Sequence, residues 1–192
     1  MSNGTPQFVG DLSGSPDNDT LVGGFGTFAI WGGDGNDVIT GTPDSNLLTG
    51  DLGADDMDGE AGNDFLFGGP DDDLLLGGDD SDMLIGSFGN DVIDGEAGDD
   101  LLFGGDGSDG FFVLGATGRD VIADFEPGVD TIAVRSASVD IILDTPEAVL
   151  RSLATSADGS AVLSLGGGNF VTILGLAPAQ LTAADFIIAD QV

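Results

Sequence analysis

Aspartates at a fixed spacing are the residues of this sequence best suited to chemistry, and that chemistry is the binding of hard divalent cations. They form two series, each of which recurs at every eighteenth position. The odd column is Asp19, Asp37, Asp55, Asp73, Asp91 and Asp109, and the even column contains Asp64, Asp82 and Asp100. Ca²⁺ takes carboxylate and backbone carbonyl oxygens, whereas Zn²⁺ prefers histidine and cysteine, which this sequence lacks. The predicted cofactor is therefore Ca²⁺.

The charge of the chain points the same way. The 192 residues include 35 acidic residues and only three basic ones, all arginines, for a net charge of −32. Such a chain repels nucleic acids and anionic membrane surfaces, so we expect no nucleic-acid partner and no membrane insertion. The 41% hydrophobic content is enough for a core once the charge is compensated. A counterion is therefore implied.

Catalytic patterns are missing from the sequence. The absence of histidine excludes HExxH and Ser/His/Asp arrangements, and neither GxSxG nor GxxxxGK[ST] occurs. Pairs of carboxylates do occur, but they recur with a period, whereas a catalytic pair is singular. We therefore expect that the chain is not an enzyme.

A nine-residue repeat must position the aspartates. Glycine occupies every ninth position from Gly14 to Gly104, which defines eleven units ending at Phe112, and the aspartates are the sixth residues of these units. The eighth residue is apolar in every unit: Leu21, Ile30, Ile39, Leu48, Met57, Leu66, Leu75, Leu84, Ile93, Leu102 and Phe111. Each unit predicts a six-residue loop followed by a three-residue strand whose middle side chain points inward. Two units make one turn of a coil, so equivalent residues of every second unit lie above one another in two parallel sheets.

Units such as GGDGNDVIT at 32–40 and GGDGSDGFF at 104–112 resemble the GGxGxDxUx nonapeptide of RTX (repeats-in-toxin) proteins. The resemblance implies an all-β fold, a right-handed parallel β-roll followed by a small β-rich C-terminal cap. It also implies that each ion lies between consecutive turns and takes loop carbonyls from the first four motif positions. Examples of the glycines concerned are Gly33, Gly35, Gly89, Gly105 and Gly107.

The two columns predict different numbers of sites. The unbroken odd column offers up to five neighbouring pairs, whereas the even column begins with Phe28 and Asn46 and offers two complete pairs. We therefore expect about seven bound Ca²⁺ ions. Each ion stabilises the fold by roughly 4 kcal/mol when calcium is in thousandfold excess over Kd, so we also expect calcium-induced folding. Solvated turn aspartates are the alternative. Against it, 24 acidic residues and no basic ones lie between Gly14 and Phe112, and without cations their stack would repel itself.

The two outer faces of the roll also differ. The even face is apolar and carries Ala29, Trp31, Leu47, Thr49, Phe65, Phe67, Met83, Ile85, Leu101 and Phe103, whereas the odd face is mixed. Soluble monomers seldom leave such a patch bare. Either the C-terminal segment or an N-terminal strand at 7–12 covers it, or it binds a second copy or a protein partner through Trp31, Phe65, Phe67, Met83 and Phe103.

The sequence predicts three regions: a leader or capping strand at 1–13, the roll at 14–112, and a capping and secretion-signal region at 113–192. Within the last we expect strands at 119–125, 130–134, 140–143, 161–165 and 170–174, and a helix at 146–153. This region resembles the serralysin-like segment that follows the repeats in type I secreted RTX proteins. DFII at 185–188 resembles their uncleaved export signal, although four residues follow it, and a last strand of the cap is the alternative.

The absence of a Sec-type signal favours type I export to the extracellular space. The predicted function is a secreted, acidic, calcium-binding repeat protein that acts as a structural or interaction module. The alternative is a calcium-dependent polysaccharide-binding accessory module, similar to the repeat modules of alginate epimerases.

Overall fold

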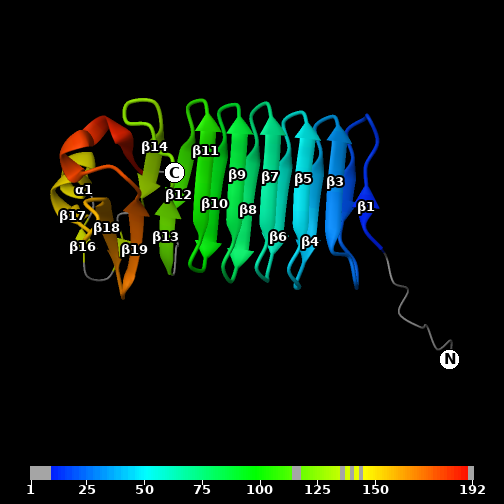
Figure 1. Ribbon diagram of the computed structural model, residues 1–192, viewed down its shortest axis with the longest axis horizontal. Helices are drawn as coiled ribbons and strands as arrows, with labels where there is room; N and C mark the ends of the chain where they lie inside the picture. Colours follow the sequence, from blue (N-terminus) through cyan, green and yellow to red (C-terminus); the bar gives the residue numbers. More distant parts are fainter. Residues whose placement is uncertain (1–9, 114–117, 135–136, 139–140, 143–144, 190–192) are drawn as a thin grey trace.

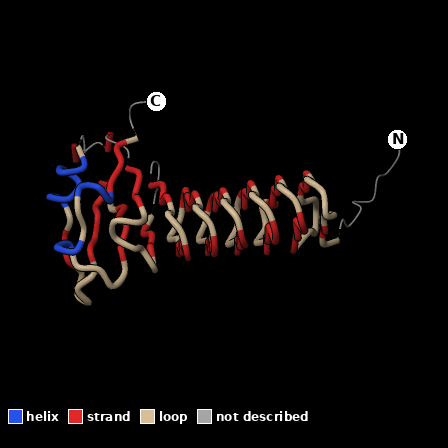
Figure 2. The backbone as a smooth tube through the Cα atoms, turned by 90° about the horizontal axis from the view of Figure 1, so that it is seen from above, coloured by secondary structure: helices blue, strands red, loops and turns tan. Residues whose placement is uncertain are grey.

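A computed structural model describes residues 10–113, 118–134, 137–138, 141–142 and 145–189, and these form a parallel β-solenoid (Figure 1). Seen from above, the coil is a regular stack of rungs, and the helices gather at one end of it (Figure 2). The predicted all-β roll of two parallel sheets with a β-rich cap is confirmed. Among the described residues, no helix combines the length and apolar character that a membrane crossing needs.

Two sheets make up the roll and continue into the cap. The ten-stranded sheet has the order β1 (Leu12–Ser13), β3 (Ala29–Asp34), β5 (Leu47–Leu52), β7 (Phe65–Pro70), β9 (Met83–Phe88), β11 (Leu101–Asp106), β13 (Arg119–Ile122), β19 (Asn169–Ile173), β18 (Ala161–Gly166), β17 (Ala154–Thr155). The eight-stranded sheet has the order β2 (Thr20–Val22), β4 (Val38–Thr42), β6 (Asp56–Glu60), β8 (Leu74–Asp79), β10 (Val92–Ala97), β12 (Gly110–Val113), β14 (Thr131–Val134), β20 (Phe186–Ile188).

The register of the sheets confirms the predicted columns. Leu21 pairs with Ile39, and Ile39 with Met57, always in parallel. Many strands are longer than the short strand that one unit predicts, as in the six residues of β7. The reason is that the first residues of the next loop stay in the ladder, where Gly69 pairs with Ser87. The turns are therefore held together along most of their length.

The core is one file of apolar side chains. From Ile30 to Phe111 the eighth residue of each unit is at most 1% exposed, whereas Leu21, near the N-terminal end, is only partly buried. At the other end the file continues into the cap, where the rings of Phe111 and Phe125 lie 6.1 Å apart. Each half-turn thus contributes a single buried apolar side chain, so a turn gains its core only by stacking on its neighbours.

The cap continues both sheets with longer steps along the chain. Leu101 pairs with Val121, and Phe111 pairs with Ile132, so each step exceeds the two units that make a turn of the roll. The predicted strands at 119–125, 130–134, 161–165 and 170–174 correspond to β13, β14, β18 and β19. The strand predicted at 140–143 lies partly outside the described residues, which contain β16 (Ile141–Ile142) paired with β15 (Ala137–Ser138).

Three short helices complete the cap: α1 (Pro146–Ser152), η1 (Pro178–Gln180) and η2 (Ala183–Asp185). The first corresponds to the helix predicted at 146–153. It begins where the Thr145 hydroxyl accepts a hydrogen bond from the backbone N–H of Ala148, and Pro146 follows directly.

The apolar even face is the outer surface of β3, β5, β7, β9 and β11, and the described parts of the two predicted covers do not lie over it. The C-terminal strands pair edge-on with β13 and β14, because the strand edges at the last turn need hydrogen-bond partners. At the other end, the part of 7–12 that is described leads into β1, which pairs with the edge of β3. Ala29 is buried there, but the described residues leave the rest of this face open, with Phe65 and Phe67 half-buried by their neighbours.

Candidate metal sites

From Asp37 onward, one carboxylate oxygen of each aspartate in the columns accepts a hydrogen bond from the backbone of the preceding turn. The N–H of Asp37 donates to Oδ1 of Asp55 at 2.8 Å, and the N–H of Asp73 donates to Oδ1 of Asp91 at 2.8 Å. From Asp37 onward, the aspartates of both columns are only 1–4% exposed. The stacking of turns thus brings these carboxylates into line and removes them from water.

The second carboxylate oxygen is left without a partner. Oδ2 is buried and accepts no hydrogen bond in eight aspartates: Asp37, Asp55, Asp64, Asp73, Asp82, Asp91, Asp100 and Asp109. An unpaired buried charge is strongly unfavourable, and a carboxylate in this position must be protonated or must bind a cation. These oxygens are the strongest indication of a metal site in the described part of the chain.

The unpaired oxygens point to a space that only glycine leaves free. A Cβ atom on Gly77 would lie 2.6 Å from Oδ2 of Asp82 and 2.8 Å from the carbonyl oxygen of Gly95 in the next turn. A Cβ atom on Gly32 would lie 2.5 Å from Oδ2 of Asp37 and 2.6 Å from the Gly50 carbonyl oxygen. A carboxylate and a carbonyl oxygen from consecutive turns therefore converge beside the first glycine in six of the units with an unpaired Oδ2, namely those that begin at Gly32, Gly50, Gly59, Gly68, Gly77 and Gly86. Such oxygens suit Ca²⁺.

The second residue of each unit separates two kinds of turn, which we call open and closed. In an open turn this residue has a positive φ, and the aspartate four positions later has an unpaired Oδ2. Glu96 shows that glycine is not required, since it stands where the nonapeptide motif has a glycine and still has a φ of 63°. The second residues of the open turns are Gly33, Asp51, Glu60, Gly69, Gly78, Ser87, Glu96 and Gly105.

Closed turns, in which the chain itself satisfies the polar side chain, occur only near the N-terminal end of the described roll. The backbone N–H of Ser15 donates to Oδ2 of Asp19 at 2.6 Å, and that of Thr42 donates to Oδ1 of Asn46 at 2.6 Å. The amide nitrogen of Asn46 in turn donates to the carbonyl oxygen of Thr27 at 3.1 Å. Asp19 therefore differs from the other predicted aspartate ligands.

The predicted glycine ligands lie in the turns beside the aspartates. Gly33, Gly35, Gly89, Gly105 and Gly107 all have positive φ, between 104° and 152°, which glycine adopts more readily than other residues. Within the described residues, no three acidic side chains gather as a metal-binding group. An ion between two turns must therefore complete its coordination with carbonyl oxygens, which is the role predicted for these glycines.

Sequence reasoning missed two aspartates that extend the columns into the cap. The N–H of Asp100 donates to Oδ1 of Asp120 at 3.3 Å, and the N–H of Asp109 donates to Oδ1 of Asp130 at 3.0 Å. Both are buried, at 2% and 4% exposure. Their longer spacing hides them from a search with a fixed period. The available signal was the Asp-x-apolar triplet, which recurs as DVI at 120–122 and DTI at 130–132.

Burial raises the pKa of most of the buried aspartates in line with the columns: Asp55, Asp64, Asp73, Asp82, Asp91, Asp100, Asp109 and Asp120. The pKa of Asp73, Asp82 and Asp120 is raised to about 7, chiefly by burial and in addition by neighbouring carboxylates such as Asp91 and Asp100. The hydrogen bond from the preceding turn opposes this shift in pKa at Asp73 and Asp82. Without a cation, the aspartates with a raised pKa therefore hold protons more tightly than free aspartates do.

Comparison with known proteins agrees with this geometry. The family model of the RTX calcium-binding nonapeptide repeat matches in four copies, at residues 11–27, 31–66, 49–84 and 76–111, which together make up just over half of the chain. No curated protein matches the sequence.

Two solved structures resemble the chain in part. The extracellular lipase LipA from Serratia marcescens is 19% identical with a TM-score of 0.41, and the match covers 92% of this chain and 39% of the lipase. The AlgE6R3 subunit of the Azotobacter vinelandii mannuronan C5-epimerase is 24% identical with a TM-score of 0.42, and the match covers 91% of this chain and 81% of the subunit. The chain thus spans well under two thirds of the lipase. On the strength of the four matched copies, the chain belongs to the RTX family of calcium-binding nonapeptide-repeat proteins.

Proposed function

We propose that this chain is a secreted, non-enzymatic module that folds as it binds calcium between the turns of its roll. The observation that carries the proposal is the set of eight buried Oδ2 atoms without a hydrogen-bond partner. One ion for each of these oxygens gives eight sites, compared with the seven expected from the sequence. The difference is that the closed turn at Asp19 is left out, and that Asp100 and Asp109 gain partners in Asp120 and Asp130.

The energetics favour a switch from unfolded to folded chain. A ligand that binds only the folded state stabilises it by about 4 kcal/mol per site at a thousandfold excess over Kd, and several such sites exceed the stability of an ordinary domain. Extracellular calcium modules bind at about 0.1 to 1 mM, a concentration that the cytosol does not reach. Calcium-driven folding after export follows from this difference.

Type I export is part of the proposal, and the DFII motif supports it by resemblance. In the folded chain this motif includes the strand β20, in which Phe186 is 3% exposed. Asp185 is buried as well, and its Oδ1 accepts a hydrogen bond from the N–H of Gly128 at 2.7 Å. The motif can serve both as an export signal and as the last strand of the cap if an exporter binds it before the chain folds. A cytosol low in calcium would keep the chain unfolded until then.

The apolar even face is proposed to bind a second copy of the chain. None of its ten residues is charged, whereas the odd face carries Asp56, Asp58 and Asp94. Two acidic copies would therefore meet with least repulsion through the even face. Light scattering of the calcium-loaded protein tests this, and a strict monomer at high concentration would exclude it.

Calcium titration followed by circular dichroism and calorimetry tests the proposed function. We expect an unfolded spectrum in excess chelator at neutral pH, a β-sheet spectrum with millimolar calcium, and about eight bound ions; magnesium at equal ionic strength is the control. A folded spectrum in excess chelator would refute calcium-driven folding. The polysaccharide-binding alternative remains a prediction, which a glycan array with and without calcium tests.

A further inference from the structure

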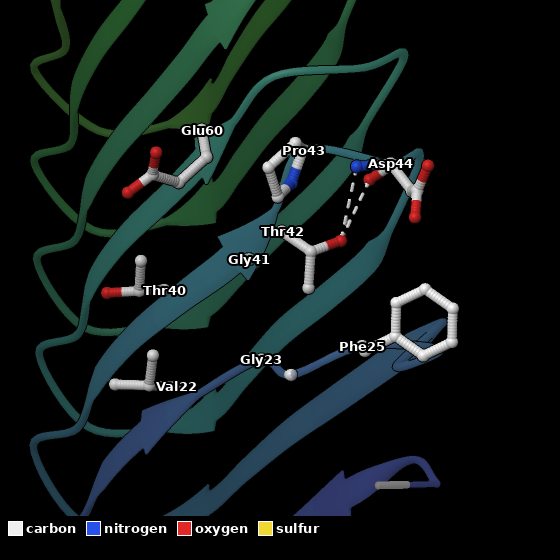
Figure 3. A pocket seen from close by; sticks show the side chains of 10 residues that line it. Val22, Gly23, Phe25, Thr40, Gly41, Thr42, Pro43, Asp44 and Glu60 are labelled. Carbon is white, nitrogen blue, oxygen red and sulfur yellow. Dashed lines mark hydrogen bonds between the residues drawn. The ribbon is translucent and has the colours of Figure 1, made fainter. Parts of the chain in front are cut away.

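A pocket of about 490 Å³ opens on the outside of the roll near its N-terminal end. Figure 3 shows it between the outer side of β2 and β4 and the loops that follow these strands. Its lining combines apolar, hydroxyl and carboxylate side chains, among them Val22, Phe25, Thr42, Pro43, Asp44 and Glu60. The pocket is separate from the carboxylate columns, which lie between the turns.

Large apolar side chains are unusually exposed around this pocket. Val22 is 60% exposed and Phe25 is 66% exposed, and both line it. Phe28, Trp31 and Val38 do not line the pocket but are also exposed in the first turns of the roll, Trp31 on the outer surface of the other sheet. Exposed apolar side chains that gather at one end of a soluble protein are typical of an interaction surface.

Two carboxylates give the pocket its charge. The side chains of Asp44 and Glu60 are exposed, and no hydrogen bond or ion pair to either carboxylate is found among the described residues. Asp44 is held by Thr42, whose hydroxyl accepts from the N–H of Asp44 at 3.2 Å (Figure 3). This loop belongs to the closed turn of Asn46, in which the chain satisfies its own polar atoms without an ion. Calcium in that turn is therefore not needed, and the Asp44 charge stays available to a ligand.

The charge of the whole chain decides which ligand fits. The net charge is −32, and no lysine or arginine precedes Arg119. A second copy of this chain or any other acidic partner would be repelled from two exposed carboxylates, whereas a cationic partner would be attracted over a long range. Lysine and arginine also carry an apolar stem, which can pack on apolar side chains while the charged end reaches the carboxylates.

We propose that this pocket is the docking site for a basic side chain carried by a partly apolar segment of a partner protein. The aliphatic stem of a lysine or arginine packs against the apolar side chains of the lining, Val22, Phe25 and Pro43, and its charged end reaches one of the two carboxylates, Asp44 or Glu60. The Phe25 ring adds an attraction for the cation. An apolar residue beside the basic one covers the exposed side chains around the pocket.

Peptide binding to the calcium-loaded full chain tests the proposal. The probe is a blocked hexapeptide with one arginine between two leucines, and its control has glutamine in place of the arginine. We expect nuclear magnetic resonance shifts confined to residues 22–25, 40–44 and 60. We also expect the double variant Asp44→Asn, Glu60→Gln to bind about tenfold more weakly, as the loss of a charge-assisted hydrogen bond implies.

The matched control is the double variant Asp34→Asn, Asp106→Asn, which removes two exposed carboxylates outside the pocket and should bind like the wild type. Circular dichroism with calcium checks that each variant folds. Equal weakening in both double variants, or shifts spread over all acidic turns, would show unspecific attraction and overturn the proposal. So would the absence of binding, or pocket shifts that grow with protein concentration without peptide, which would indicate a second copy.

Discussion

Replacement of Asp73 by alanine tests whether neighbouring turns share their ligands. Asp73 lies in the middle of the odd column and is 3% exposed. Its Oδ1 accepts a hydrogen bond from the N–H of Asp55 at 2.8 Å, and its Oδ2 is unpaired. One oxygen thus faces the preceding turn, and under the proposed arrangement the other serves the site with Asp91. The substitution should therefore damage two sites.

The expected loss is large compared with the stability of a domain. Two sites contribute about 8 kcal/mol at a thousandfold excess of calcium over Kd, and the unpaired N–H of Asp55 costs a further ~1 to 3 kcal/mol. Asp19→Ala is the contrasting variant, because Oδ2 of Asp19 is bound by the N–H and hydroxyl of Ser15 at 2.6 and 2.9 Å. Asp19→Ala should therefore lower the stability of the fold by about 1 kcal/mol. It should not reduce the number of ions bound by the unpaired Oδ2 atoms.

Calorimetry and circular dichroism along a calcium titration measure both effects. Asp73→Ala should bind two ions fewer than the wild type and should need much more calcium to fold, whereas Asp19→Ala should stay close to the wild type. Asp73→Asn separates the causes, since its amide oxygen can still accept from Asp55 although the charge is gone. Equal effects of Asp73→Ala and Asp19→Ala would refute the shared-ligand column.

Three further predictions concern protons, space and the cap. In chelator, acidification from pH 7.5 to pH 5 should increase the β-sheet signal in circular dichroism. The reason is that the pKa of Asp73 and Asp82 is about 7 in the folded chain and lower in the unfolded chain. Their protonation therefore stabilises the fold at low pH, and this stabilisation is lost as the pH rises through 7. A signal that falls on acidification would contradict this. Gly77→Ala should destabilise the calcium-loaded fold by about 1 to 3 kcal/mol in denaturant titrations, because the added Cβ would lie 2.6 Å from Oδ2 of Asp82. Gly10→Ala is the control and should not change the stability, because a Cβ on Gly10 would have no atom within 4 Å. Asp120→Ala should remove one ion and expose the cap to proteolysis before the roll; an unchanged ion count would exclude Asp120 as a ligand.

The sequence was sufficient to predict the roll, because the repeat of the roll can be read from the positions of single residue types. Glycine at every ninth position and an apolar residue at the eighth predict the half-turn, and the register of two units per turn then follows from stacking. The imbalance between the columns is a prediction from the same regularity, since Phe28 cannot ligate an ion and Asn46 is only a weak neutral donor.

The sequence was not sufficient to tell open turns from closed ones. That difference depends on the φ of the second residue, and residue type does not decide it: Ser87 adopts a φ of 95°, whereas Ser15 instead donates to Asp19. Asp120 and Asp130 were not predicted for another reason. In the cap the number of residues from one turn to the next is larger than in the roll, although the hydrogen bond between turns is kept. In both cases the backbone conformation carries information that the period alone does not.

Under the proposed function, calcium binding and folding are coupled in this roll. Most of the unpaired oxygens lie near a carbonyl oxygen of the next turn, as Oδ2 of Asp82 lies near the carbonyl oxygen of Gly95, so the ligands come from more than one turn. Each turn likewise contributes too little apolar surface to form a core alone, and the file from Ile30 to Phe111 exists only when the turns are stacked. An ion therefore binds where two turns have already met, and two turns stay together where an ion offsets the repulsion of their carboxylates. Folding should spread from turn to turn, and the turns with unpaired oxygens should respond to calcium more steeply than the closed turns at the N-terminal end.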